Sequence, residues 1–211
     1  MRVVYTKESA VNKVVTILSL SLILGACASA TPKTEVTGIS VELPQDNWIQ
    51  VTNKEATGQY IKEWVPSGKT PLDTNWIITE QKLPIQSKIT AEKFQKSMFS
   101  LAKQSCSDVL YNGPQDINVS DHMTSVGRIM CAKQNGKLYG TFTDQRVVIQ
   151  GLTAYVVTSE LRIPASSKAG ILSFGKDQLS EMKEFMQRQG ESSSFVRKSV
   201  NVCLSDSVNC I

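Results

Sequence analysis

Hydrophobic and polar positions alternate along much of the chain, which predicts a series of short β-strands. Alternating runs bounded by Pro, Gly, Asn and Asp are typical of strands with one buried face. Such runs occupy residues 39–43, 48–52, 60–65, 76–83, 125–133, 138–143, 146–149, 152–163 and 195–202. Asn135-Gly136 predicts a tight hairpin turn, because both residues tolerate positive φ, and Gly151 predicts a β-bulge.

Two segments have the apolar spacing of a helix instead. The first covers residues 91–105, with Thr90 as its N-cap and an apolar stripe formed by Phe94, Met98 and Leu101. The second covers residues 178–189, with Asp177 as its cap, Gly190 at its end, and a stripe of Leu179, Met182, Phe185 and Met186. Residues 192–194 are expected to form a loop.

The order of strands, helix, strands and helix predicts an α+β domain, in which an antiparallel sheet carries about two helices on one face. This outline is similar to the sandwich shared by DcrB-like, Mog1-like and PsbP-like proteins, several of which are accessory proteins of the envelope or the thylakoid lumen. The resemblance rests on the order of elements and on no shared motif. It therefore implies a fold and leaves the activity open.

The first residues have the pattern of an export signal. Residues 1–13 contain three basic residues, Arg2, Lys7 and Lys13, and a single acid, Glu8. Residues 14–24 carry no charge. These are the basic and apolar regions of a signal peptide. The apolar run is too short for a transmembrane helix, which needs roughly 20 residues. We expect residues 1–26 to be removed.

Leu24-Gly25-Ala26-Cys27 follows the apolar run and resembles the lipobox of bacterial lipoproteins. The resemblance implies cleavage by signal peptidase II, a diacylglyceryl group on Cys27 and further acylation, so that the membrane is a partner through lipid. Several acyl chains on one residue make attachment permanent. In a Gram-negative host, Ala28 in place of Asp implies the outer membrane, facing the periplasm. The alternative is an ordinary signal peptide with an Ala-x-Ala cleavage site and loss of Cys27.

Composition gives the mature chain a modest size and charge. Removing 26 of the 211 residues leaves 185, divided into a flexible lipidated tether, residues 27–38, and one domain, residues 39–211. The net charge falls from +4 to +2, because three basic residues and one acid are lost. A nearly balanced charge gives no electrostatic reason to expect nucleic acid.

The four remaining cysteines predict two disulfides, because they are even in number and the compartment is oxidising. Of the three connectivities we favour one pair in the middle of the chain and one at its end, Cys106 with Cys131 and Cys203 with Cys210. A zinc site is the alternative, but close Cys-x-x-Cys spacing does not occur in the sequence. We expect neither a metal nor a cofactor.

Two catalytic motifs are incomplete. The segment from Gly170 to Lys176 has the Gly-x-x-x-x-Gly-Lys spacing of a phosphate-binding loop, but Asp177 replaces the required Ser or Thr. His122 is the one histidine and would have to be the base of a serine or cysteine hydrolase. The Gly-x-Ser-x-Gly sequence that surrounds the nucleophile in many such enzymes does not occur. We interpret His122 as a solvated loop residue.

Glu63 and Glu80 lie on neighbouring predicted strands and could form a glycosidase pair across a cleft. Exposed acids on a sheet face are the alternative, and we favour it. We therefore do not expect an enzyme.

Aromatic residues gather in the first third of the mature chain: Trp48, Tyr60, Trp64 and Trp76. They are candidates for an interface, but we favour core packing for most of them. The predicted lipid anchor, the two disulfides and the lack of catalytic motifs favour a non-catalytic accessory or structural subunit of an envelope assembly. A secretion or conjugation apparatus is one such assembly, with envelope proteins as partners. A lipoprotein that binds a small hydrophobic ligand or a glycan is the alternative, and an envelope hydrolase is the second.

Overall fold

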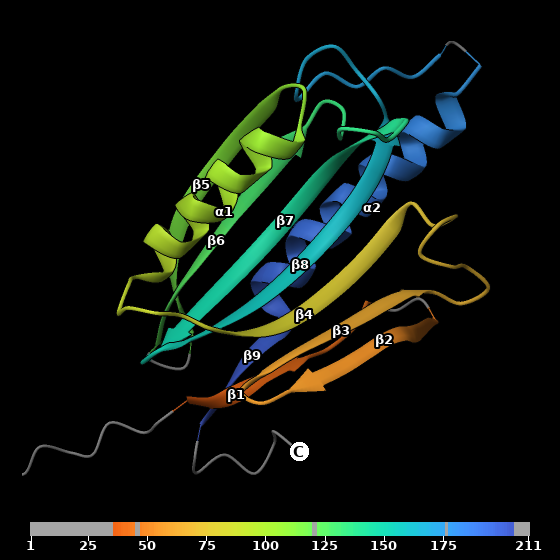
Figure 1. The fold of residues 1–211 in the computed structure, drawn as a ribbon. Coiled ribbons are helices and arrows are strands. Elements are labelled where there is room, and N and C mark those ends of the chain that lie inside the picture. Colours follow the sequence, from red (N-terminus) through yellow and green to blue (C-terminus); the bar gives the residue numbers. More distant parts are fainter. Residues whose placement is uncertain (1–35, 45–46, 120–121, 176, 205–211) are drawn as a thin grey trace, which may run out of the picture. The chain divides into compact units, whose positions relative to one another are not determined.

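The computed structural model describes residues 36–44, 47–119, 122–175 and 177–204. Within them, seven antiparallel strands form one sheet in the order β2-β3-β4-β8-β7-β6-β5 (Figure 1). A separate two-stranded ribbon pairs the first strand with the last, β1 with β9. The strands are β1 Val36–Val41, β2 Trp48–Ala56, β3 Gln59–Pro66, β4 Trp76–Pro84, β5 Val109–Val119, β6 His122–Cys131, β7 Tyr139–Gln150, β8 Thr153–Pro164 and β9 Val200–Leu204.

The two helices, α1 (Ala91–Ser105) and α2 (Leu179–Lys198), cover opposite faces of this sheet (Figure 1). Val147 of β7 packs with Phe94 of α1, whereas the next residue, Val148, packs with Phe195 of α2. Successive residues of a strand point to opposite faces. The α+β class with an antiparallel sheet and two helices is confirmed, and the expectation that both helices share one face is wrong.

The β1–β9 ribbon lies on the same face of the sheet as α2. Val36 and Val202 share a core cluster with Val148 and Phe195, and the hydroxyl of Tyr155 donates to the carbonyl of Thr37 over 3.3 Å. Since β1 begins at Val36 and Val36 is buried, the folded part begins before the predicted boundary at residue 39.

Helix α1 has the predicted bounds, and the predicted N-cap is confirmed. The amide of Lys93 donates to Oγ1 of Thr90 over 3.2 Å. The turn at Asn135-Gly136 is also confirmed, with Gly136 at a φ of +71°. By contrast, Gly151 is not a bulge: it lies in the turn between β7 and β8, where Gln150 pairs with Thr153.

Helix α2 is longer than predicted and continues through Gly190 and the serines that were expected to form a loop. Its second half is buried at Ser192, Phe195 and Val196. This burial outweighs the roughly 1 kcal/mol that a helical glycine loses against alanine. The helix starts after Gln178, which makes no side-chain cap, so Asp177 is not the N-cap. Only the end of the predicted strand over residues 195–202 is extended, as part of β9.

Strand β5 was not predicted, because its sequence is polar and contains Gly113-Pro114. The register with β6 shifts between Asn112 and Gln115, so the irregular pair lies at a bulge in an edge strand. A Cβ atom at Gly113 would lie 2.9 Å from the Cα of Gly127, and its φ is +122°. Both observations require glycine at this position.

The burial of α2 predicts where substitutions destabilise the domain. Phe195→Ala should lower the free energy of unfolding by about 3 to 5 kcal/mol, because a buried ring is removed from the core, whereas Leu179→Ala, at a position 54% exposed, should change it by less than about 0.5 kcal/mol. Urea denaturation of the two variants measures this. Equal losses would contradict the placement of the second half of α2.

Candidate functional site

One of the two predicted disulfides is confirmed. Cys106, which follows α1, is bonded to Cys131 at the end of β6, and their Cα atoms are 5.6 Å apart. Cys203 of β9 is also in a disulfide. Cys210 and the proposed lipid acceptor Cys27 lie outside the described residues. The pairing of Cys203 with Cys210 and the acylation of Cys27 therefore stay predictions.

The carboxylates of Glu63 and Glu80 do not form a pair. Glu80 is opposite Lys62 in the β3–β4 ladder, whereas Glu63 is opposite Thr79, so the two acids point to opposite faces of the sheet. The hydroxyl of Tyr60 donates to Oε1 of buried Glu80 over 2.6 Å. Nζ of Lys62 lies 3.7 Å from the same oxygen. The glycosidase pair is therefore ruled out, and the interpretation that we favoured, exposed acids on a sheet face, is wrong for Glu80, which is 4% exposed.

Glu63 shares its face of the sheet with a second acid, Glu160 on β8. Burial raises the pKa of the Glu160 carboxyl, and the guanidinium of Arg162 opposes this shift from 3.3 Å. Arg162 also donates to the carbonyls of Pro71 and Thr74. This group therefore fastens the connection between β3 and β4 to the sheet.

The other catalytic candidates give no assembled site in the described residues. His122 is the first residue of β6, and its side chain is not among the described groups. In the segment that resembles a phosphate-binding loop, the amide of Gly175 already donates to Oε1 of Gln178 over 2.8 Å. Lys176 lies outside the described residues.

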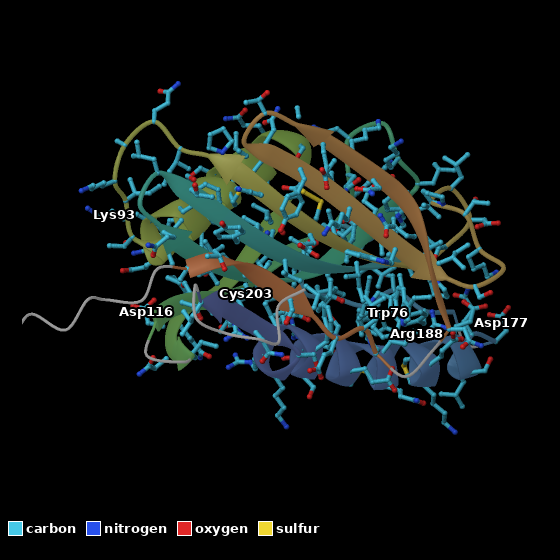
Figure 2. All side chains as sticks on the ribbon, turned by 90° about the horizontal axis from the view of Figure 1, so that it is seen from below. Trp76, Lys93, Asp116, Asp177, Arg188 and Cys203 are labelled. Carbon is cyan, nitrogen blue, oxygen red and sulfur yellow. A yellow bond between two sulfur atoms is a disulfide. The ribbon has the colours of Figure 1, made fainter. Side chains whose placement is uncertain are left out.

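The aromatic residues pack mainly against the core. Trp76 is completely buried, in edge contact with Trp48 at 5.0 Å between ring centroids, and the guanidinium of Arg188 lies over it (Figure 2). Trp64 is partly buried against the cluster under α2, and Tyr60 binds Glu80. The core explanation holds for Trp76, which offers no surface to a partner.

Sequence reasoning missed a set of charged side chains between α2 and the sheet. Arg128 of β6 donates twice to Asp144 of β7, over 2.8 and 3.0 Å. The hydroxyl of Ser192 on α2 donates to the same carboxylate over 2.7 Å. Asp144 is therefore held by one charged and one neutral partner, and it joins α2 to two strands.

Arg146, two residues further along β7, is 1% exposed. Its Nη1 lies 3.0 to 3.2 Å from the carbonyls of Val196, Arg197 and Val200, at the end of α2. A cation at a helix C-terminus is favourable, because the last carbonyls carry partial negative charge. Burial lowers the pKa of Arg146 to about 10, so the group stays charged at neutral pH. Its Nε and Nη2 have no partner among the described protein groups.

A small polar cavity of about 160 Å³ lies beside these charges. Its lining includes Asn112, Gln115, Arg128, Asp144, Ser193 and Arg197. A second hollow, of about 300 Å³, lies at the β2–β3 hairpin and is lined mainly by apolar groups, including those of Ala56, Ile61 and Leu83. The first suits water or a small polar solute, and the second is at the lower size limit of small-molecule sites.

The hydrogen bonds of the charged set under α2 are made within the fold. A general base needs a lone pair within reach of its substrate, whereas the carboxylate of Asp144 accepts three donated hydrogen bonds from Arg128 and Ser192. The sequence carried no local signal for this set, because its members lie on three elements and their separation in the chain reaches 64 residues, from Arg128 to Ser192.

Comparisons with known proteins place the chain near no characterised family. No family model and no curated protein matches it. Similar solved structures include LpqN of Mycobacterium tuberculosis, involved in cell envelope biogenesis, with 10% identity, a TM-score of 0.38, and coverage of 78% of this chain and 83% of that one. A PsbP of Synechocystis has 13% identity, a TM-score of 0.34, and coverage of 85% and 98%.

A Pseudomonas aeruginosa protein of unknown function has 8% identity, a TM-score of 0.35, and coverage of 67% of this chain and 94% of that one. With TM-scores below 0.5, these neighbours share the general outline of this chain and are no basis for its function. Within the described residues, no helix is long and apolar enough to cross a membrane.

The charged set predicts a second effect on stability. Asp144→Asn should lower the free energy of unfolding by about 3 kcal/mol, because Arg128 keeps its charge and loses its buried counter-ion. Glu92→Gln removes one partner of the exposed pair with Lys96 and should change stability by less than about 1 kcal/mol. Thermal and urea unfolding of both variants test this, and a silent Asp144→Asn would rule out a structural role for the pair.

Proposed function

We propose that this protein is a lipoprotein that acts as a non-catalytic accessory subunit of a cell-envelope assembly. The observation that carries the proposal is the sequence Leu24-Gly25-Ala26-Cys27, directly after an uncharged apolar run. In a Gram-negative host, lipid on Cys27 would hold the domain at the outer membrane, facing the periplasm. Envelope proteins would be its partners, and secretion or conjugation machinery is one setting for such a subunit.

The use of buried charge supports a structural role. Asp144 binds Arg128 and Ser192, and Glu80 binds Tyr60. Asp144 lines the small polar cavity, but its carboxylate accepts three hydrogen bonds from Arg128 and Ser192, so both acids join elements of the fold. The domain therefore resembles a module that presents binding surfaces to partners more than it resembles an enzyme with an active site.

A second candidate function is the binding of a small hydrophobic ligand. The hollow at the β2–β3 hairpin supports it, since Ala56, Ile61 and Leu83 give an apolar wall to a volume of about 300 Å³. Ligand sites usually enclose most of their ligand. A ligand there would have to be small and partly exposed.

Acylation is tested by substitution of the acceptor. The wild-type chain, expressed in its host, should incorporate radiolabelled palmitate, and Cys27→Ser should lose both the label and the processing by signal peptidase II, because the thiol is the acceptor. Ala28→Asp is the matched control, expected to keep the label and to move to the inner-membrane fraction of a Gram-negative host. An unlabelled wild type, or a Cys27→Ser form with unchanged processing and location, would refute the anchor.

The accessory role needs its own measurement. At native expression level, a pull-down in mild detergent should recover the protein together with other envelope proteins in a fixed ratio. Recovery of the lipoprotein alone would refute the subunit role, even if acylation is found.

A further inference from the structure

Three connecting segments meet at one end of the sheet and form a surface that we call the basic tip. They are the α1–β5 connection and the start of β5 (residues 103–110), the β6–β7 hairpin turn (residues 132–138), and the chain after β8 (residues 165–171) (Figure 1). Hydrogen bonds join them: the amide of Asn135 donates to the carbonyl of Ser105, and the amide of Ser166 to that of Ala132, both over 2.9 Å.

Positive charge gathers on the basic tip. It carries four exposed lysines and one acid: Lys103, Lys133, Lys137, Lys168 and Asp108. Its net charge of +3 exceeds the +2 of the whole chain after residue 26. Within the described part of the chain, none of these lysines is in an ion pair. Asp108 accepts a hydrogen bond from the amide of Ala169.

Aliphatic side chains project from the same surface. Leu138 in the hairpin turn is 90% exposed, and Ile171 and Leu110 are about half exposed, at 51% and 48%. Single exposed leucines are ordinary. Here three aliphatic groups share one tip with four lysines. The side chain of Leu110 lies close to Gly170, since a Cβ atom placed on this glycine would be 3.2 Å from Cδ2 of Leu110.

We propose that the basic tip docks on an anionic phospholipid surface, with Leu138 inserted among the acyl chains and the lysines beside the lipid phosphates. Protruding aliphatic groups surrounded by lysines are typical of interfacial membrane binding. Protein interfaces, by contrast, are enriched in aromatic residues and arginine and depleted in lysine. The aromatic residue nearest to Leu138, Tyr139, is only partly exposed and is covered by Arg162.

Leu138 comes just before β7, and Leu152 lies in the turn just after it. The basic tip and the Leu152 turn are therefore at opposite ends of this strand. Twelve residues of strand separate the two turns by about 40 Å. The start of β1 is near the Leu152 end, because Thr37 contacts Tyr155. The nine residue steps from Cys27 to Val36 span at most about 30 Å. If Cys27 carries lipid, the tether holds one end of the domain near the membrane and the basic tip contacts the membrane at the other end. The long axis of β7 would then lie roughly along the membrane surface.

Vesicle binding without the lipid anchor tests the tip independently of the proposed function. The sample is the mature chain, residues 27–211, with Cys27→Ser; residues Thr34–Ile211 form one compact unit. It should sediment with vesicles that contain phosphatidylglycerol and remain free with pure phosphatidylcholine, and binding should weaken with added salt. Because no acyl chain is present, a failure of acylation cannot produce this result.

Paired variants locate the contact. Lys133→Gln with Lys137→Gln should weaken binding about 30-fold, since each lysine contributes about fivefold near an anionic surface. Lys54→Gln with Lys88→Gln removes equal charge from exposed positions outside the tip and should leave binding nearly unchanged. Leu138→Ser should weaken binding about tenfold, whereas Leu152→Ser, in the turn at the other end of β7, should not.

Three outcomes would overturn the proposal. They are equal affinity for the two vesicle compositions, equal losses from the tip and control pairs, and no sedimentation at low salt by a chain with a native circular dichroism spectrum. In the last case, a tip-dependent complex with an acidic envelope protein would assign the surface to a protein partner instead.

Discussion

The placement of Arg146 under the end of α2 is the constraint on which this half of the domain depends. Its guanidinium donates to the carbonyls of Val196 and Arg197, which have no partner within the helix because they lie in its last turn, and to the carbonyl of Val200. Two of these residues belong to α2 or its last turn, and the third begins β9. One side chain therefore joins the end of the helix to the start of the next strand. The β1–β9 ribbon then packs beside it on the sheet.

The opposite face is organised by apolar contact and a covalent link. Phe94 of α1 packs on Val147 and Val156, while the disulfide between Cys106 and Cys131 joins the end of α1 to β6. The disulfide removes conformational freedom from the unfolded chain. In both layers, the helix is linked to strands β6 and β7, and β7 is buried on both faces.

Local signals in the sequence were sufficient for much of this fold. Thr90 and the apolar spacing after it define α1, and Asn135-Gly136 defines the β6–β7 turn, because each signal acts within a few residues. The second half of α2 could not be found in this way. Its helical state depends on contacts of Ser192 and Phe195 with distant strands, which override the local preference of Gly190 and the serines.

Candidate sites were harder to predict than elements. Glu63 and Glu80 were correctly placed on adjacent strands, but a shift of one residue in register decides which face each side chain occupies. The pair of Arg128 with Asp144 is likewise set by the register of β6 and β7. The lysines of the basic tip become neighbours only when three turns meet. Among the described residues, the carboxylates of Asp144 and Glu80 bind partners within the fold, whereas none of the tip lysines is in an ion pair. The proposed contact surface is therefore set by tertiary structure, which places residues from three separate parts of the chain side by side.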